Sequence, residues 1–209
     1  MEKQLELPLN YPDAPRLLGI VAPRMRSGKS EVAYHLLAEH DYDGYHMAGV
    51  LKEMIYALVC ALRPWYLHTD PWEYVYGIHK ETPIAEFGGK SARELMQTLG
   101  TDWGRNMVDE NIWVTVAASD IKSMLKDQQS VVIDDIRFPN EVEMIKSLGG
   151  QIIYVDRPVN ADTWKLEDAV LSHESEGRIR REDCDFYLLN DGTLEELRAK
   201  IDTIVNTPQ

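Results

Sequence analysis

The chain has 209 residues, of which 44% are hydrophobic, a length and composition that suit one globular domain. Its formal net charge is −13, from 22 basic and 35 acidic residues, and this balance disfavours polymeric nucleic acid and an anionic membrane as partners. No apolar run approaches the roughly 20 residues that cross a bilayer. The two cysteines cannot build a disulfide framework, so the composition predicts a cytoplasmic protein that binds no membrane.

The first elements in chain order are a strand and a helix. The apolar run of residues 17–22 predicts a strand that is buried on both faces. Apolar residues at helical spacing predict a helix over residues 31–40, directly after the intervening loop. A short strand is expected near residues 45–47, followed by a helix over residues 50–62. Residues 63–90 are rich in proline, glycine and aromatic side chains without periodicity, so an inserted, substrate-facing region is expected there rather than a sheet element.

The second half of the chain alternates strands with helices. Ser91 is a candidate N-cap with Glu94 at capping-box spacing, which predicts the start of a helix. This alternation predicts an α/β fold with a mainly parallel sheet, built as one domain over residues 1–209. Further helices are expected over residues 112–126, 139–148 and 193–205, and strands over residues 130–135, 151–155 and 186–189.

A phosphate-binding motif stands between the first strand and the first helix. Ser27-Gly28-Lys29-Ser30 occupies the strand–loop–helix context that a P-loop requires. In such a loop, which here includes Arg26, backbone N–H groups and the positive end of the helix dipole surround the phosphates. Gly28 permits close backbone approach, Lys29 supplies a cation for the outer phosphates, and the Ser30 hydroxyl can ligate Mg²⁺. The motif therefore predicts that the chain binds ATP and Mg²⁺.

Pro23 departs from the usual pattern Gly-x4-Gly-Lys-Ser/Thr, which has glycine at this position. Proline fixes φ near −65° and has no N–H, so the first turn of the loop is expected to differ from the usual one. The alternative interpretation is a chance tetrapeptide at a helix N-cap, and the apolar run directly before the loop weighs against it.

Two carboxylates, Asp134 and Asp135, end the apolar strand that begins at residue 130. P-loop enzymes hold Mg²⁺ or its waters with a carboxylate at the end of a neighbouring strand. Because successive strand residues face opposite ways, only one of the two is expected to face the loop, and a solvated strand end is the alternative. Arg137 follows at the strand tip, where it could clamp a phosphate or pair with Glu141 or Asp135. Arg157, at the tip of another strand, is a further candidate for the nucleotide site.

Four blocks of sequence form a recognisable set: residues 93–105 (RELMQTLGTDWGR), residues 134–141 (DDIRFPNE), His173-x-Ser175-Glu176, and residues 185–197 (DFYLLNDGTLEEL). Together they are similar to the phage-type deoxynucleoside monophosphate kinases. This resemblance implies a P-loop NTPase three-layer α/β fold with an inserted acceptor-binding region, residues 63–110, and a lid, residues 157–183. It implies transfer of the γ-phosphoryl group of ATP to a deoxynucleoside 5′-monophosphate, a homodimer, and the host cytoplasm for a phage-encoded protein.

The resemblance also implies where the acceptor nucleotide binds. It places Arg93, Gln97 and Arg105 in the acceptor region, with Lys52 at its edge. Without the resemblance, exposed arginines such as these are as compatible with a solvated or ion-paired surface as with acceptor binding. Trp103 could stack on a base or anchor a core.

A lid is expected to carry cations over the transferring phosphate. Arg178, Arg180 and Arg181 are the candidates, and a helix face on which they pair with Glu174, Glu176 and Glu182 is the alternative.

The expected mechanism rests on positioning and charge. Lys29 and the loop amides hold the donor phosphates, Ser30 with Asp134 or Asp135 holds Mg²⁺, and Arg137 neutralises the transferring group. One alternative is a P-loop kinase for a different acceptor, either a hydroxymethylated base in DNA or a small metabolite. The acidic balance weighs against DNA, and the arginines weigh against an uncharged metabolite. The other alternative, which Pro23 keeps open, is a nucleotide-binding regulator without catalysis.

Overall fold

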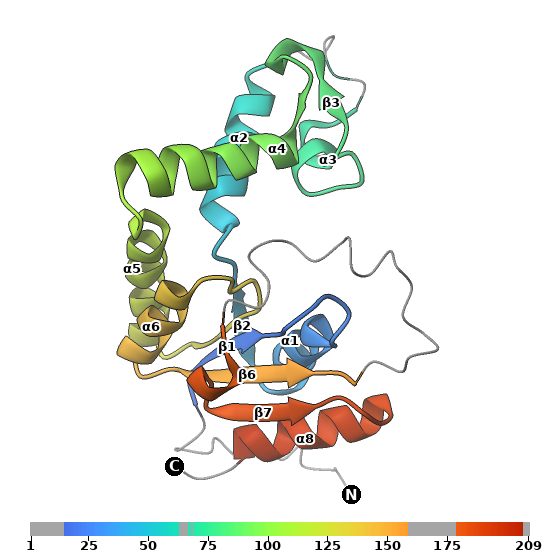
Figure 1. The fold of residues 1–209 in the computed structure, drawn as a ribbon, viewed down its shortest axis with the longest axis vertical. Coiled ribbons are helices and arrows are strands. Elements are labelled where there is room, and N and C mark those ends of the chain that lie inside the picture. Colours follow the sequence, from blue (N-terminus) through green and yellow to red (C-terminus); the bar gives the residue numbers. More distant parts are fainter. Residues whose placement is uncertain (1–14, 63–66, 68, 159–178, 207–209) are drawn as a thin grey trace, which may run out of the picture. The chain divides into compact units, whose positions relative to one another are not determined.

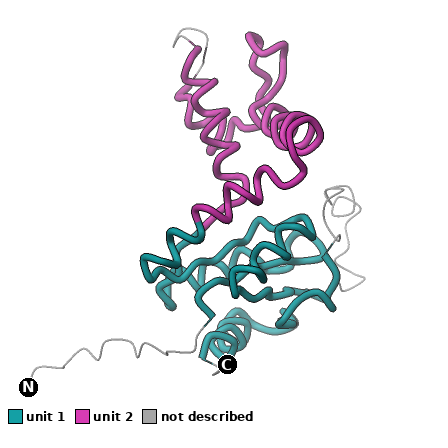
Figure 2. The backbone as a smooth tube through the Cα atoms, turned by 90° about the vertical axis from the view of Figure 1, so that its left-hand side faces the viewer, with its two compact units in different colours: residues 1–44, 121–209 teal, residues 45–120 magenta. Residues whose placement is uncertain are grey.

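A computed structural model describes residues 15–62, 67, 69–158 and 179–206. The chain divides into two compact units, the first formed by residues 1–44 and 121–209 and the second by residues 45–120 (Figure 2). The second unit is thus an insertion in the first. The expected acceptor-binding region, residues 63–110, falls inside the second unit, and most of the expected lid lies outside the described residues.

A five-stranded sheet forms the centre of the first unit, in the order β2-β5-β1-β6-β7 (Figure 1). β1 pairs in parallel with both β5 and β6, and β6 pairs in parallel with β7, which confirms the predicted parallel sheet. Every residue of β1 is buried, as its unbroken apolar run predicts. The short strand expected near residues 45–47 ends at Tyr45 instead. The strands are β1 (Leu17–Val21), β2 (Tyr42–Tyr45), β5 (Ser130–Ile133), β6 (Gln151–Asp156) and β7 (Phe186–Leu189).

Helices cover both faces of this sheet and make three layers. On one face, α1 (Lys29–Glu39) and α8 (Leu194–Asn206) bury their apolar stripes against the strands. On the other face lies α6 (Pro139–Ser147), which brings Ile145 close to β1. A Cβ added to Gly19 of β1 would lie 2.9 Å from Ile145 Cδ1, so the glycine permits this close packing. These layers confirm the predicted α/β class.

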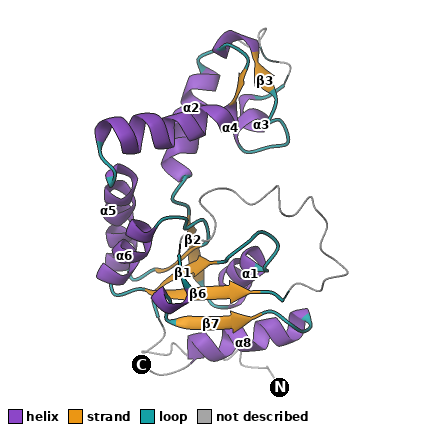
Figure 3. Cartoon of the chain, in the orientation of Figure 1, coloured by secondary structure: helices purple, strands orange, loops and turns teal. Residues whose placement is uncertain are grey.

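The second unit has a small core of its own. This unit is built from short elements (Figure 3). They enclose a cluster of buried side chains that includes Ile55, Val59 and Tyr74. Two strands of two residues each, at residues 83–84 and 90–91, pair in an antiparallel manner, so the expectation that residues 63–90 contain no sheet element is wrong. The elements are α2 (Gly49–Cys60), α3 (Pro71–Val75), β3 (Pro83–Ile84), η2 (Ala85–Phe87), β4 (Lys90–Ser91), α4 (Ala92–Gln97), η3 (Thr98–Val108) and α5 (Ile112–Lys126), which continues past the unit boundary.

The predicted capping box at Ser91 is confirmed. The Ser91 hydroxyl accepts a hydrogen bond from the Glu94 backbone N–H, and the Glu94 carboxylate accepts one from the Ser91 backbone N–H. The helix continues into η3, which is a π-helix. The Trp113 indole packs against η3 and donates a hydrogen bond to the Gly100 carbonyl at 2.8 Å. A Cβ on Gly104 would lie 2.4 Å from Trp113 Cζ2, so this position must remain without a side chain.

The two ends of the second unit are joined to each other. The Tyr45 hydroxyl donates a hydrogen bond to Asp120 Oδ2 at 3.2 Å, so the chain enters and leaves this unit at one place. Among the helices in the described residues, none is both long and apolar enough to cross a membrane.

Candidate active site

The loop between β1 and α1 has the backbone geometry of a phosphate cradle. Gly28 adopts φ 101°, a left-handed conformation that glycine accepts without strain, and it is the N-cap residue of α1. As a glycine, Gly28 makes no side-chain cap hydrogen bond, so its side chain does not stand between the start of the helix and a ligand. The first N–H groups of a helix and the helix dipole favour an anion.

Pro23 does not prevent the loop from turning. It is half-buried and does not line the pocket, and the left-handed residues that turn the loop lie further on, at Arg26 (φ 61°) and Gly28. The departure at Pro23 is therefore compatible with a loop that begins α1 at Lys29.

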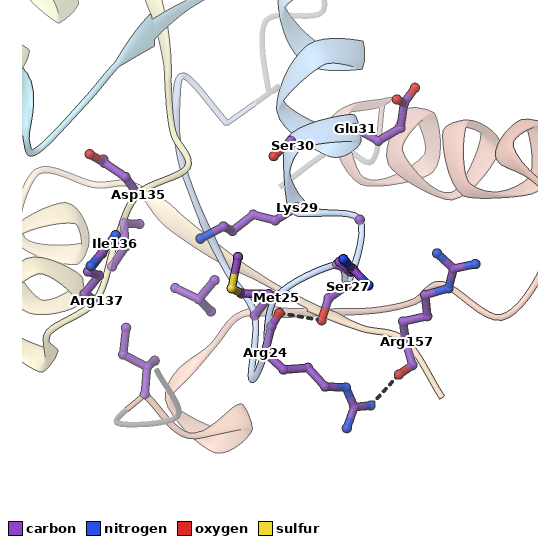
Figure 4. Close-up of a pocket in the computed structure, with 15 residues that line it drawn as sticks. Arg24, Met25, Ser27, Lys29, Ser30, Glu31, Asp135, Ile136, Arg137 and Arg157 are labelled. Atoms are coloured by element: carbon purple, nitrogen blue, oxygen red, sulfur yellow. Dashed lines mark hydrogen bonds between the residues drawn. The ribbon is translucent and has the colours of Figure 1, made fainter. Parts of the chain in front are cut away.

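A pocket of about 580 Å³ lies over this loop (Figure 4). In Figure 4 the Lys29 side chain extends from the start of α1 toward the segment that carries Asp135 and Arg137. The pocket brings together side chains from the loop, from the segment after β5 and from the end of β6. Its lining includes the predicted residues Arg26, Ser27, Gly28, Lys29, Ser30, Asp135, Arg137 and Arg157.

Ser27 contributes to the loop in a way that the motif did not predict. Its side chain is buried, and the hydroxyl donates a hydrogen bond to the Arg24 carbonyl at 2.9 Å. Its own carbonyl accepts a hydrogen bond from Asn190 Nδ2 at 3.0 Å, from the segment that follows β7. The Ser27 side chain therefore stabilises the loop, and the group of Ser27 that can contact a phosphate is its backbone N–H.

The two carboxylates after β5 differ in their position. Asp135 lines the pocket and Asp134 does not, although an oxygen of one carboxylate lies within 4.8 Å of an oxygen of the other. Together with the Ser30 hydroxyl, Asp135 gives the pocket two hard oxygen donors of the kind that Mg²⁺ prefers. Asp134 lies beside it in sequence and outside the pocket lining.

Arg137 is presented to the pocket by the turn that starts α6. The Glu141 carboxylate, which is buried, accepts hydrogen bonds from the backbone N–H groups of Arg137 and Phe138 at 2.7 and 3.0 Å. Pro139 at the first helical position completes this start. In the described part of the chain, the Arg137 guanidinium has no ion-pair partner, so the pairing considered with Glu141 does not form.

Sequence reasoning did not name seven residues of the pocket lining as site residues: Val21, Ala22, Arg24, Met25, Glu31, Ile136 and Ile179. Arg24 donates hydrogen bonds to Asp156 Oδ1 at 3.2 Å and to the Arg157 carbonyl, which joins the loop to the end of β6 (Figure 4). Arg24 could have been predicted from the sequence, because it is a basic residue inside the loop. For Ile179, which is buried beside the loop although distant in sequence, the sequence carries no such signal.

The expected lid residues are described only in part. Arg178, His173, Ser175 and Glu176 lie outside the described residues. Arg180 pairs with Glu182 and Asp183, each at 3.2 Å, which is the ion-paired alternative.

Arg181, the third candidate for the lid, contacts an aromatic ring. Its guanidinium carbon lies over the Tyr187 ring, 3.5 Å from the centroid. This cation–π contact belongs to the surface around β7 and not to the pocket lining.

All five candidates for acceptor binding lie in the second unit, and four of them have described contacts. Arg93 pairs with Glu81 at 2.7 Å, Arg105 donates a hydrogen bond to the Glu110 carbonyl at 3.3 Å, and Lys52 lies 5.9 Å from the centroid of the Tyr76 ring. Trp103, with 41% of its surface exposed, contacts Trp113. Gln97 is exposed one helical turn after Arg93.

The parallel sheet, the loop and the pocket place the chain in the class of P-loop phosphotransferases. Comparison with known proteins identifies the family. The family model described as deoxynucleotide monophosphate kinase matches residues 73–201. A relative from Acanthamoeba polyphaga mimivirus, named "Putative deoxynucleotide monophosphate kinase", is 31% identical over 91% of this chain and 96% of its own length. The chain therefore belongs to the deoxynucleotide monophosphate kinase family and is a nucleoside monophosphate kinase.

Other similarities are more limited in extent. The deoxynucleotide monophosphate kinase of Escherichia phage RB69 is 34% identical over 55% of this chain and 45% of its own length, so the match spans about half of that relative. Among solved structures, dephospho-CoA kinase from Campylobacter jejuni has a TM-score of 0.47 at 12% identity, over 91% of this chain and 95% of its own.

Proposed function

We propose that this kinase transfers the γ-phosphoryl group of ATP to a deoxynucleoside 5′-monophosphate, with Mg²⁺, and releases the diphosphate. The observation that carries the proposal is the pocket in which Lys29, Asp135 and Arg137 meet beside an uncapped helix start. Membership of the deoxynucleotide monophosphate kinase family supports the class of acceptor.

The loop fits the phosphates of ATP on two counts. Gly28 adopts the left-handed φ of 101° that leads the loop into α1, and the start of this helix presents the positive end of its dipole to the pocket. Lys29 then adds a full positive charge at the same place. These groups bind and orient the donor, which is the main contribution a protein makes to phosphoryl transfer.

The metal assignment rests on Ser30 and Asp135. Both line the pocket, and hydroxyl and carboxylate oxygens suit Mg²⁺, alone or through its waters. When bound, Mg²⁺ neutralises charge on the phosphate oxygens. Asp134, which is outside the lining, is assigned no direct contact with the metal.

We assign to Arg137 the role of stabilising the negative charge on the phosphoryl group as it is transferred. In the described part of the chain its guanidinium is not neutralised by a carboxylate, so the full charge is available to oxygens that gain charge in the transition state. The turn that holds it is fixed by the buried Glu141 carboxylate, which limits the motion of this residue before the reaction. The ionised acceptor oxygen is already a nucleophile, so no general base is required of the protein.

Acceptor binding is assigned to the second unit. Gln97 and Trp103 are exposed there, and a half-exposed tryptophan offers a face on which a base can stack. The Arg93–Glu81 ion pair is exposed on both sides, so it contributes little stability and an incoming phosphate can replace the Glu81 carboxylate. Lys52 and Arg105 add two further cations to this unit.

The test is to incubate the protein with ATP, Mg²⁺ and each deoxy- and ribonucleoside monophosphate, and to separate the products by anion-exchange chromatography. We expect a diphosphate that forms only when a suitable monophosphate is present. We expect Lys29→Ala to remove this activity and Lys122→Ala, which changes an exposed lysine of α5, to preserve it. Phosphate release without any acceptor, or an unchanged rate in Lys29→Ala, would contradict the proposal.

A further inference from the structure

A second group of metal-ligating side chains lies in the first unit, and none of its members lines the pocket over the loop. His35 lies in α1, His40 is the C-cap residue of the same helix, and Asp202 lies in α8. The Nε2 atoms of both histidines lie 2.7 Å from the same atom, Asp202 Oδ1. The two imidazole rings approach edge to face, with their centroids 5.3 Å apart.

We propose that His35, His40 and Asp202 form a binding site for a divalent transition-metal ion, with Zn²⁺ the best fit. Two imidazole nitrogens and one carboxylate oxygen are a ligand set that Zn²⁺ accepts, with water in the fourth position. The set contains no thiolate, and imidazole ligands favour Zn²⁺, Co²⁺ and Ni²⁺ over Mg²⁺. The site therefore differs in its chemistry from the oxygen donors of the pocket.

The geometry supports a metal because the ligand atoms already converge on one point. In a tetrahedral zinc site with bonds of about 2.0–2.1 Å, neighbouring ligand atoms lie about 3.3 Å apart. The hydrogen-bonded triad is tighter than this at 2.7 Å, so the carboxylate must withdraw by roughly 0.6 Å to admit the ion. The Asp202 side chain is 45% exposed and has room to make this movement.

The two histidines are the more firmly held ligands. The side chain of His35 is 9% exposed and that of His40 is 16% exposed, so packing holds both rings in place while the more exposed Asp202 side provides the path of entry. A metal requires both Nε2 atoms without a proton, so the neutral rings carry their proton on Nδ1 in the loaded state.

A metal at this site would join the two helices that support the phosphate loop. α1 begins at Lys29, and α8 already contacts the first turn of α1 through the Arg198–Glu31 ion pair at 2.8 Å. The triad makes a second connection between the same helices at the other end of α1. A bound ion there would stabilise the folded first unit by mass action, without taking part in phosphoryl transfer.

Cobalt is the direct probe, because tetrahedral Co²⁺ absorbs visible light whereas Zn²⁺ does not. The full chain is stripped of metal with a chelator and titrated with Co²⁺ in excess Mg²⁺, which occupies oxygen sites. We expect a visible band that saturates at one equivalent and that Zn²⁺ abolishes. At a hundredfold excess of Zn²⁺ over its Kd, we expect Tm to rise by about 5 °C.

Three variants locate the site. Asp202→Asn and His40→Ala are expected to weaken Co²⁺ binding more than tenfold and to lose the rise in Tm, whereas His79→Ala, a histidine of the second unit, should bind as the unmodified protein does. Circular dichroism verifies that each variant is folded. The proposal is overturned if the unmodified chain shows no visible band at submillimolar Co²⁺, or if Asp202→Asn binds as tightly as the unmodified chain.

Discussion

Asn190 holds the phosphate loop through Ser27: its Nδ2 donates a hydrogen bond of 3.0 Å to the Ser27 carbonyl, across 163 positions of sequence. The same Nδ2 would lie 2.4 Å from a Cβ added to Gly28, so the amide fills the space beside that glycine. The Ser27 hydroxyl holds the loop from the other side through the Arg24 carbonyl. The loop is thus fixed on both sides of Ser27 before any nucleotide binds.

The first prediction concerns this contact. Asn190→Ala is expected to raise the KM for ATP about three- to tenfold, because one net hydrogen bond is worth about 0.5–1.5 kcal/mol. The KM for the monophosphate should not change. Steady-state kinetics with each substrate varied in turn measures both values. Asn206→Ala, at the exposed end of α8, is the control, and an unchanged KM for ATP in Asn190→Ala would refute the role of this contact.

The second prediction concerns Arg137. Arg137→Ala is expected to lower kcat by about 10²–10³-fold with a smaller change in the KM for ATP, because its charge is assigned to the transition state. Arg137→Lys retains the charge but loses the planar fork, so it should recover part of the lost rate. If Arg137→Ala changes only KM, the residue binds substrate equally in the ground state and the assignment is wrong.

The third prediction concerns the packing of the second unit. Gly104→Ala places a methyl group 2.4 Å from Trp113 Cζ2, and overpacking of this kind costs about 1–3 kcal/mol. We expect the free energy of unfolding to fall by that amount, as measured by urea denaturation with Trp fluorescence. In Gly49→Ala, the control, the new Cβ meets only His46 at 4.0 Å and should not destabilise the protein.

The fourth prediction concerns pH and the capping box of α4. The hydrogen bond from the Ser91 backbone, with help from the Lys90 side chain, holds the pKa of Glu94 below its ordinary value of 4.5. A lowered folded-state pKa contributes stability above pH 4.5 that is lost as pH falls through the folded-state value. Glu94→Gln should therefore be less stable than the unmodified protein at pH 7, and the difference should shrink toward pH 3. Denaturant titrations at both pH values measure it, and a difference that is independent of pH would contradict this account.

The sequence allowed the central strands and the loop to be predicted because their signals are local. The unbroken apolar run of β1, the motif that starts α1 and the proline that starts α6 each act within a few residues. The sequence left open which of the two aspartates lies at the loop, and Asp135 is the one that lines the pocket.

What could not be predicted depends on contacts between distant segments. Asn190 meets Ser27, and Arg24 meets Asp156, only because β7 and β6 lie in the same sheet as β1. Similarly, the reason for Gly104 becomes visible only when Trp113 is seen to pack against η3. No periodicity in residues 63–90 indicated the short strand pair, since two residues are too few to show a pattern.

The hydrogen bond between Tyr45 and Asp120 has a consequence for how such an enzyme can evolve. A segment whose ends already meet can be exchanged for another of different length without disturbing the sheet into which it is inserted. The residues assigned to ATP lie in the first unit, and those assigned to the acceptor lie in the second, with a core of its own. Selection can therefore change the preferred base by altering the second unit, while the first unit continues to bind the same phosphoryl donor.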